Sequence, residues 1–72
     1  METIGERAAR LIKERVRYGK VKPELDRIGV DTYAFYGWDE GRYNPSAYYL
    51  QQMALAGYDV IYILTGKENK KC

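Results

Sequence analysis

The chain has 72 residues, a formal net charge of +2, no histidine and a single cysteine, Cys72. A chain of this length forms one domain, and neither an internal disulfide nor a zinc site can strengthen its small core. No apolar run reaches the roughly 20 residues that a membrane-spanning helix needs, and the N-terminal residues lack the pattern of a secretion signal. We therefore expect a cytoplasmic protein that depends on packing and self-association.

The first predicted element is an amphipathic helix that begins near residue 4 and ends before Gly19. Thr3 and Glu6 have the spacing of a capping box at its start. Residues 1–22 hold seven Lys or Arg against three acidic residues, so this region suits an anionic partner. The apolar stripe that should face the core consists of Ile4, Ala8, Leu11, Ile12 and Val16.

Two short helices are predicted next, over about residues 22–28 and 32–40. Pro23 fits the first turn of the earlier helix and Gly29 ends it, which leaves Val30 as a buried turn residue. Asp31 is a suitable N-cap for the later helix, and Gly41 ends it. Residues 23–41 hold one basic residue against five acidic ones, and we expect those acids to be solvated.

The third helix should place Phe35 and Trp38 in the core, with Ala34 on the same face, because these residues recur at helical spacing. Tyr33 and Tyr36 lie one turn apart on the opposite face. Gly37 weakens this helix by about 1 kcal/mol relative to alanine.

A fourth helix is predicted to start at Asn44 as N-cap and Pro45 as first residue, and to run to about Ala56 before Gly57. Asp59 caps a fifth, apolar helix that ends at Gly66. The segment 59–65 is also rich in β-branched and aromatic residues and could be a strand, but no second strand is evident to pair with it. The inward residues of the fourth helix should be Ala47, Leu50, Met53 and Ala54.

Two stretches of the chain resemble a known family. The first stretch contains Gly29-Val30-Asp31, then Phe35, then Trp38-Asp39-Glu40-Gly41 and Asn44-Pro45-Ser46-Ala47. Its order and spacing resemble the lambda-repressor-like (XRE, Cro/CI-type) helix-turn-helix family of phage and prophage regulators. The second stretch, residues 56–66, is similar to the ending of many prophage repressor-type members.

This resemblance implies an all-α fold, a compact five-helix domain over residues 1–66 whose second and third helices form the helix-turn-helix, followed by a polar tail at 67–72. It implies a DNA-binding transcriptional regulator, a repressor or Cro-like protein, that binds operator DNA as a homodimer without a cofactor. The chain departs from the family at Leu25, where a small residue is usual, and in a first helix and loop about two residues longer.

The resemblance places the third helix in the major groove and puts the base-contacting positions at its start. Family members typically carry Gln, Arg, Lys, Asn or Ser there, and none of the residues in this chain forms a bidentate base contact alone. We therefore expect modest direct readout supplemented by DNA shape. The positions are Asp31, Thr32, Tyr33, Tyr36 and Gly37.

Affinity for DNA comes mainly from phosphate contacts. We expect these contacts from the basic first helix and its loop, and from the residues after the third helix, where the resemblance also places them. The candidates are Arg10, Arg17, Lys20, Lys22, Arg42, Tyr43 and Asn44.

The apolar fifth helix carries more hydrophobic surface than so small a core can cover. We predict that Tyr58, Ile61, Tyr62 and Leu64 form a two-fold interface. Such a dimer would place two recognition helices about one DNA turn apart, roughly 34 Å.

Catalysis is not expected, because the chain has no histidine, no Ser or Cys beside a base and no glycine-rich phosphate loop. An alternative to DNA binding is a protein-interaction module on the same fold, an anti-repressor or an accessory protein that binds another regulator. Tyr33 and Tyr36 would then be interface anchors, and the acidic middle segment favours this alternative.

Overall fold

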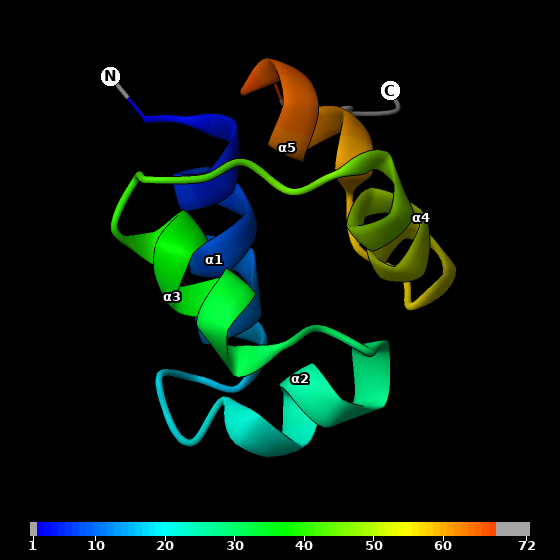
Figure 1. The fold of residues 1–72 in the computed structure, drawn as a ribbon. Coiled ribbons are helices and arrows are strands. Elements are labelled where there is room, and N and C mark those ends of the chain that lie inside the picture. The colour runs from blue at the N-terminus through cyan, green and yellow to red at the C-terminus, as the bar shows by residue number, and fades with distance from the viewer. Residues whose placement is uncertain (1, 68–72) are drawn as a thin grey trace.

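The computed structural model describes residues 2–67, which form helices and no strand. The helices are α1 (Ile4–Arg15), α2 (Lys22–Ile28), α3 (Thr32–Asp39), α4 (Ala47–Leu55) and α5 (Val60–Thr65). In Figure 1, α3 packs along α1, α2 lies across one end of this pair, and α4 and α5 lie on the other side of α1. The predicted all-α fold is confirmed, and segment 60–65 is a helix rather than a strand. The predicted tail beyond Lys67, with Cys72, lies outside the described residues.

Every helix contributes to one core. The largest fully buried side chains are Ile12 from α1, Leu25 from α2, Phe35 and Trp38 from α3, Met53 from α4 and Ile63 from α5. Ala8 and Ala9 are also fully buried, so α1 presents small residues to its neighbours. None of the helices in residues 2–67 has the length and apolar character needed to cross a bilayer.

The start of α1 is as predicted, and its end is not. The Glu6 N–H donates to Thr3 Oγ1 at 3.0 Å, and the Thr3 N–H donates to Glu6 Oε1 at 2.7 Å. The helix ends at Arg15, because Arg17 and Tyr18 both adopt left-handed backbone, with φ of 55° and 60°. The Tyr18 N–H then donates to the Lys13 carbonyl and the Arg17 N–H to the Glu14 carbonyl. This is a Schellman ending in which arginine, not Gly19, occupies the usual glycine position.

The turn between α2 and α3 follows the sequence prediction closely. Gly29 adopts a left-handed φ of 75° and donates its N–H to the Leu25 carbonyl, which also accepts from the Val30 N–H. Val30 is buried. Asp31 occupies the N-cap position of α3 but makes no capping hydrogen bond with its side chain.

The predicted start of α4 is wrong by two residues. The helix begins at Ala47 with Ser46 as N-cap, and Asn44 and Pro45 belong to the preceding connection. Met53 is buried and Leu50 is half-buried, whereas Ala47 and Ala54 are exposed, contrary to their predicted inward placement.

The α5 helix starts with the predicted cap. Asp59 Oδ1 accepts from the Tyr62 N–H at 3.0 Å. At the other end Gly66 adopts φ 74°, as expected for a helix-ending glycine.

Candidate nucleic-acid interface

The exposed face of α3 carries tyrosines. Tyr33 and Tyr36 are 63% and 49% exposed, while Phe35 and Trp38 on the other face are buried. Among the other candidate base-contacting residues, Asp31 is exposed and Thr32 is half-buried. The prediction that α3 has a buried face and an opposite exposed face is confirmed, because Phe35 and Trp38 pack in the core and the tyrosines remain exposed.

Gly37 does not belong to this exposed set, contrary to the accessible position expected of a base-contacting residue. It is buried, because the ring of Tyr43 lies directly over it. A Cβ atom at position 37 would lie 2.1 Å from Tyr43 Cδ2, a distance that no real contact allows. Gly37 weakens α3 locally, but the absence of a side chain there leaves room for the ring of Tyr43 from the following connection.

Tyr43 extends the tyrosine face of α3. Its hydroxyl lies 3.0 Å from that of Tyr33, and the two ring centroids are 6.1 Å apart. This hydrogen bond raises the pKa of the Tyr33 hydroxyl above its ordinary value. The guanidinium of Arg42 lies over the Tyr43 ring, with Cζ 5.6 Å from the centroid, and pairs with Glu40 at 2.8 Å. A cation, two hydroxyls and two rings thus lie side by side next to α3.

The connection that carries Tyr43 is tied to the start of α1. Asn44 Oδ1 accepts from the Gly5 N–H at 2.9 Å. The same connection passes so close to α1 that a Cβ atom at position 5 would lie 2.2 Å from the Tyr43 carbonyl oxygen. The path of this segment across α1 is visible in Figure 1. The carboxamide oxygen of Asn44 holds the connection in place, while Asn44 itself is exposed and its predicted phosphate contact stays a prediction.

Arg10 is likewise engaged within the protein, which argues against its predicted phosphate contact. Its guanidinium pairs with Glu2 at 2.7 Å and with Glu14 at 3.3 Å, and it donates to the hydroxyl of Tyr62. These hydrogen bonds, that from Glu2 foremost, raise the pKa of Arg10 further. Arg10 therefore joins α1 to α5.

The other predicted phosphate-contacting cations are more accessible. Arg17 and Lys20 are exposed in the connection between α1 and α2, and neither forms an ion pair with another residue of the described part of the chain. Lys22 pairs with Asp26 at 2.7 Å, but both side chains are exposed. Such a pair contributes at most about 1 kcal/mol, so a phosphate can replace the carboxylate.

The acidic segment is less negative than its composition indicates. Four of its five acids form ion pairs: Glu24 with Arg27, Asp26 with Lys22, Asp39 with Lys13 and Glu40 with Arg42. Asp31 is the exception within residues 2–67. The pairing reduces the repulsion that these carboxylates would exert on phosphates near α3.

Glu24 is largely buried, contrary to the solvated position that the sequence predicts for it. Its side chain is only 10% exposed. It accepts from Arg27 at 2.6 Å and from the Tyr58 hydroxyl at 2.5 Å, and Arg15 lies 3.7 Å away. The Arg27 hydrogen bond lowers the pKa of Glu24, while burial raises the pKa of Tyr58. The cluster attaches α2 to α1 and to the α4–α5 connection.

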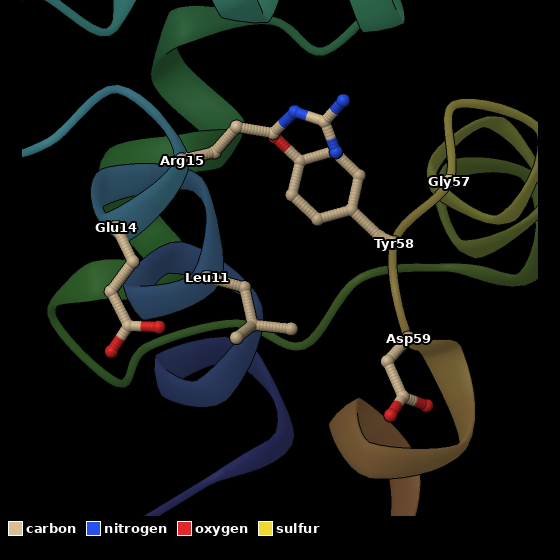
Figure 2. Close-up of a pocket in the computed structure, with 6 residues that line it drawn as sticks. All are labelled: Leu11, Glu14, Arg15, Gly57, Tyr58 and Asp59. Carbon is tan, nitrogen blue, oxygen red and sulfur yellow. The ribbon is translucent and has the colours of Figure 1, made fainter. Parts of the chain in front are cut away.

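Tyr58 is consequently not available for the predicted dimer interface. It is 8% exposed and belongs to the core. Tyr58 lies beside an open depression of about 410 Å³ (Figure 2). The Arg15 guanidinium lies 5.2 Å from the centroid of the Tyr58 ring. The other residues that line the depression are Leu11, Glu14, Gly57 and Asp59. The other predicted interface residues are at least partly accessible: Ile61 and Leu64 are exposed and Tyr62 is half-buried.

Arg7 has a structural role that the sequence does not predict. Its guanidinium donates to the carbonyls of Ile63 and Leu64, at 2.8 and 3.4 Å, and so caps the C-terminal end of α5. Its helical spacing on α1 gave no signal for this contact, because its partners lie more than 50 residues away.

Within residues 2–67, no group of three or more His, Cys, Asp or Glu side chains is arranged to hold a metal ion. Comparison of the chain with protein-family models, with curated proteins and with solved structures found no match.

Proposed function

We propose that this protein is a DNA-binding transcriptional regulator of the lambda-repressor-like helix-turn-helix type, with α2 and α3 as the motif and α3 as the recognition helix. The observation that carries the proposal is the α3 helix itself. One face is anchored in the core by Phe35 and Trp38, and the opposite face is exposed and lined with hydroxyl-bearing side chains. A helix must be held in this way to enter the major groove without losing its support.

The connection from α2 to α3 supports the same function. Gly29, Val30 and Asp31 join two short helices through a left-handed glycine and a buried valine, so the angle between the helices is fixed from within. A fixed angle gives the recognition helix a defined direction relative to the rest of the domain.

Phosphate contacts come from cations on either side of this motif. Arg17 and Lys20 are exposed before α2, and Arg42 is exposed after α3. Arg42 now pairs with Glu40 in an exposed ion pair, which a phosphate can replace. Each phosphate contact contributes about 0.9 to the slope of log K against log salt.

Binding as a homodimer is part of the proposal. Ile61 and Leu64 are 53% and 42% exposed on α5, and Leu55 at the end of α4 is 78% exposed. A small domain gains stability when such apolar side chains are covered by a second copy. Analytical ultracentrifugation of the wild type and of Ile61→Asp tests for the dimer. At a two-fold interface the new carboxylate would lie opposite the same carboxylate of the second copy, and the two charges would repel each other.

A DNA-selection experiment tests the proposed function. The protein is incubated with a randomised duplex pool, the bound fraction is sequenced, and fluorescence anisotropy gives the affinity for the enriched duplex at several salt concentrations. We expect a short palindrome and a steep salt dependence. Arg17→Ala and Lys20→Ala should each flatten the slope by about 0.9 per lost contact. The absence of any enriched sequence would contradict the proposal.

One observation favours the alternative, a protein-interaction module on the same fold. Asp31 at the start of α3 is exposed and has no cationic partner among residues 2–67, so it would repel a phosphate placed there. Under this alternative Tyr36→Ala would abolish binding to a partner regulator, whereas Arg17→Ala and Lys20→Ala would have little effect.

A further inference from the structure

Tyr33 and Tyr43 present their hydroxyls as one unit. The two oxygen atoms are 3.0 Å apart, and both side chains are substantially exposed. One tyrosine comes from the exposed face of α3 and the other from the connection that follows it, ten residues later. The rings are tilted by 46° and their centroids are 6.1 Å apart, so the two hydroxyls lie closer together than the rings do.

The unit is held in a fixed position before any ligand arrives. The ring of Tyr43 rests on Gly37, where no side chain stands in its way. The backbone N–H of Tyr43 donates to the Gly37 carbonyl at 3.3 Å, and the adjacent Asn44 is bonded to Gly5. Little side-chain freedom remains for Tyr43 to lose on binding, and such preorganisation favours specific contacts.

The hydrogen-bonding capacity of the pair is defined by its internal bond. A tyrosine hydroxyl has one donor and can also accept. Once one hydroxyl donates to the other, the pair retains one free O–H donor and, on the neighbouring oxygen, one free acceptor. In the major groove an adenine presents an acceptor, N7, beside a donor, the N6 amino group, whereas a guanine presents two acceptors. The pair therefore complements adenine, much as an Asn or Gln carboxamide does.

Arg42 lies beside the tyrosine pair, where a cation could contact a phosphate next to the adenine. Arg42 lies over the Tyr43 ring on the side of the connection and is exposed. A guanidinium there is placed to meet the phosphate backbone that flanks the groove while the hydroxyls face the base edge.

We propose that the Tyr33–Tyr43 pair reads an adenine in the major groove as a single donor–acceptor unit, and that Tyr43 is a base-contacting residue rather than a phosphate-contacting one. This inference depends on the DNA-binding function proposed above. Tyr43, whose ring covers Gly37, thus takes the place of Gly37 among the base-contacting residues.

The test uses the duplex enriched by the wild-type protein. Affinities are measured by fluorescence anisotropy for the wild type, Tyr33→Phe, Tyr43→Phe and the double variant. Phenylalanine keeps each ring and removes only the hydroxyl. Tyr48→Phe is the matched control, because Tyr48 is an exposed tyrosine on α4 without a hydrogen bond to another described residue. Thermal melting of each variant verifies that the fold is retained.

We expect each single variant to lose about 10-fold in affinity, the size of one good bidentate base contact. The double variant should lose about as much as either single variant, since the hydroxyls act together. Replacement of adenines one at a time by 7-deazaadenine, which lacks the N7 acceptor, should weaken wild-type binding about 10-fold at one position of each half-site. The double variant should be insensitive to that replacement.

Two results would overturn the inference while leaving the proposed function intact. In one, Tyr33→Phe and Tyr43→Phe bind the enriched duplex as tightly as the wild type. In the other, their losses multiply in the double variant, which means that the hydroxyls act independently. A wild-type protein that enriches no sequence would overturn both the inference and the proposed function.

Discussion

The two long connections of the chain, residues 16–21 between α1 and α2 and residues 40–46 between α3 and α4, are held in different ways. The α3–α4 connection is attached to the body of the protein by its own residues: the Tyr43 ring on Gly37 and the Asn44 carboxamide on Gly5. The hydrogen bonds of the α1–α2 connection are local and between backbone groups, two of its residues adopt left-handed backbone, and only its last residue, Val21, packs against the core.

Under the proposed function, this difference suits two kinds of contact with DNA. Hydroxyls that read a base edge must be held at fixed positions, whereas a phosphate contact tolerates movement of a long cationic side chain. The attached connection carries Tyr43, and the weakly attached one carries Arg17 and Lys20. The helix α2 is held by the buried Leu25 and Ile28 and by the hydrogen bond from the Tyr58 hydroxyl to Glu24.

The largest effect is expected at the crossing of the α3–α4 connection over α1. Gly5→Ala places a Cβ atom 2.2 Å from the Tyr43 carbonyl oxygen and 3.1 Å from Trp38 Cα, and both are backbone atoms that cannot yield easily. Overpacking costs about 1–3 kcal/mol and occasionally more, so we expect a loss of at least about 3 kcal/mol. Urea denaturation measures it. Gly19→Ala is the control in the other connection, and a similar loss there would contradict the comparison.

The next effect is expected at Glu24, which binds the Tyr58 hydroxyl and so connects α2 to the α4–α5 connection. Glu24→Gln keeps the shape of the side chain but removes the charge that Arg27 and Tyr58 contact. Hydrogen bonds to charged groups contribute about 1.5–3 kcal/mol, so we expect a loss of about 2 kcal/mol in the free energy of unfolding at pH 7.

The same variant gives a prediction for pH. The pKa of Glu24 is lowered in the folded protein from an ordinary value of 4.5. Its contribution to stability is therefore complete above pH 4.5 and is lost as the pH falls through the lower, folded pKa. The difference between wild type and Glu24→Gln should shrink in acid, as urea denaturation between pH 7 and pH 3 can measure. A difference that does not change with pH would rule out this role for the carboxylate.

A smaller effect is expected at Asn44. Asn44→Ala removes the acceptor for the Gly5 N–H, and an unpaired donor in a partly buried site costs about 1–2 kcal/mol. Asn44→Asp retains an acceptor and adds a negative charge near the start of α1, which the helix dipole favours. We expect Asn44→Asp to melt near the wild-type temperature and Asn44→Ala to melt below it. Equal melting of both variants with the wild type would show that the connection does not need this tether.

The smallest effect is expected in the α1–α2 connection and has the opposite sign. Arg17→Gly relieves the left-handed backbone at φ 55° and should stabilise the protein by about 0.5–1 kcal/mol. Arg17→Ala removes the same charge without relieving the backbone. Under the proposed function, both variants should weaken DNA binding equally, while only the glycine variant becomes more stable. Stabilisation by both, or by neither, would show that the backbone at Arg17 is not strained.

Much of the fold was predictable because it depends on neighbours along the chain. The apolar stripe of α1, the capping box of Thr3 and Glu6, and the glycine after α2 each involve residues at most four positions apart. The end of α1 was wrong because Arg17 adopts the left-handed backbone usual for glycine, and the start of α4 was wrong where a distant contact intervened. Asn44 is a residue type that favours the N-cap position, but its side-chain oxygen accepts a hydrogen bond from the N–H of Gly5, 39 residues away.

The candidate site was predictable in outline and not in detail. The exposed tyrosines of α3 follow from the spacing of Phe35 and Trp38, which fixes the opposite face. The position of Tyr43 over Gly37 does not follow, because it depends on where the chain returns after leaving the helix. The engagement of Arg10 by Glu2 and Tyr62 and the burial of Glu24 and Tyr58 have the same origin.

By itself, the sequence determined an all-α chain with an amphipathic first helix, a glycine-centred turn between α2 and α3, and a tyrosine face opposite a buried aromatic pair. These features arise from backbone propensities and from periodicity, which act over one or two helical turns. The tertiary structure alone decided which polar side chains are free and which are engaged, since that depends on residues far apart in the chain. It buried Gly37 and Tyr58, engaged Arg10 with Glu2 and Tyr62, and brought Tyr43 beside Tyr33.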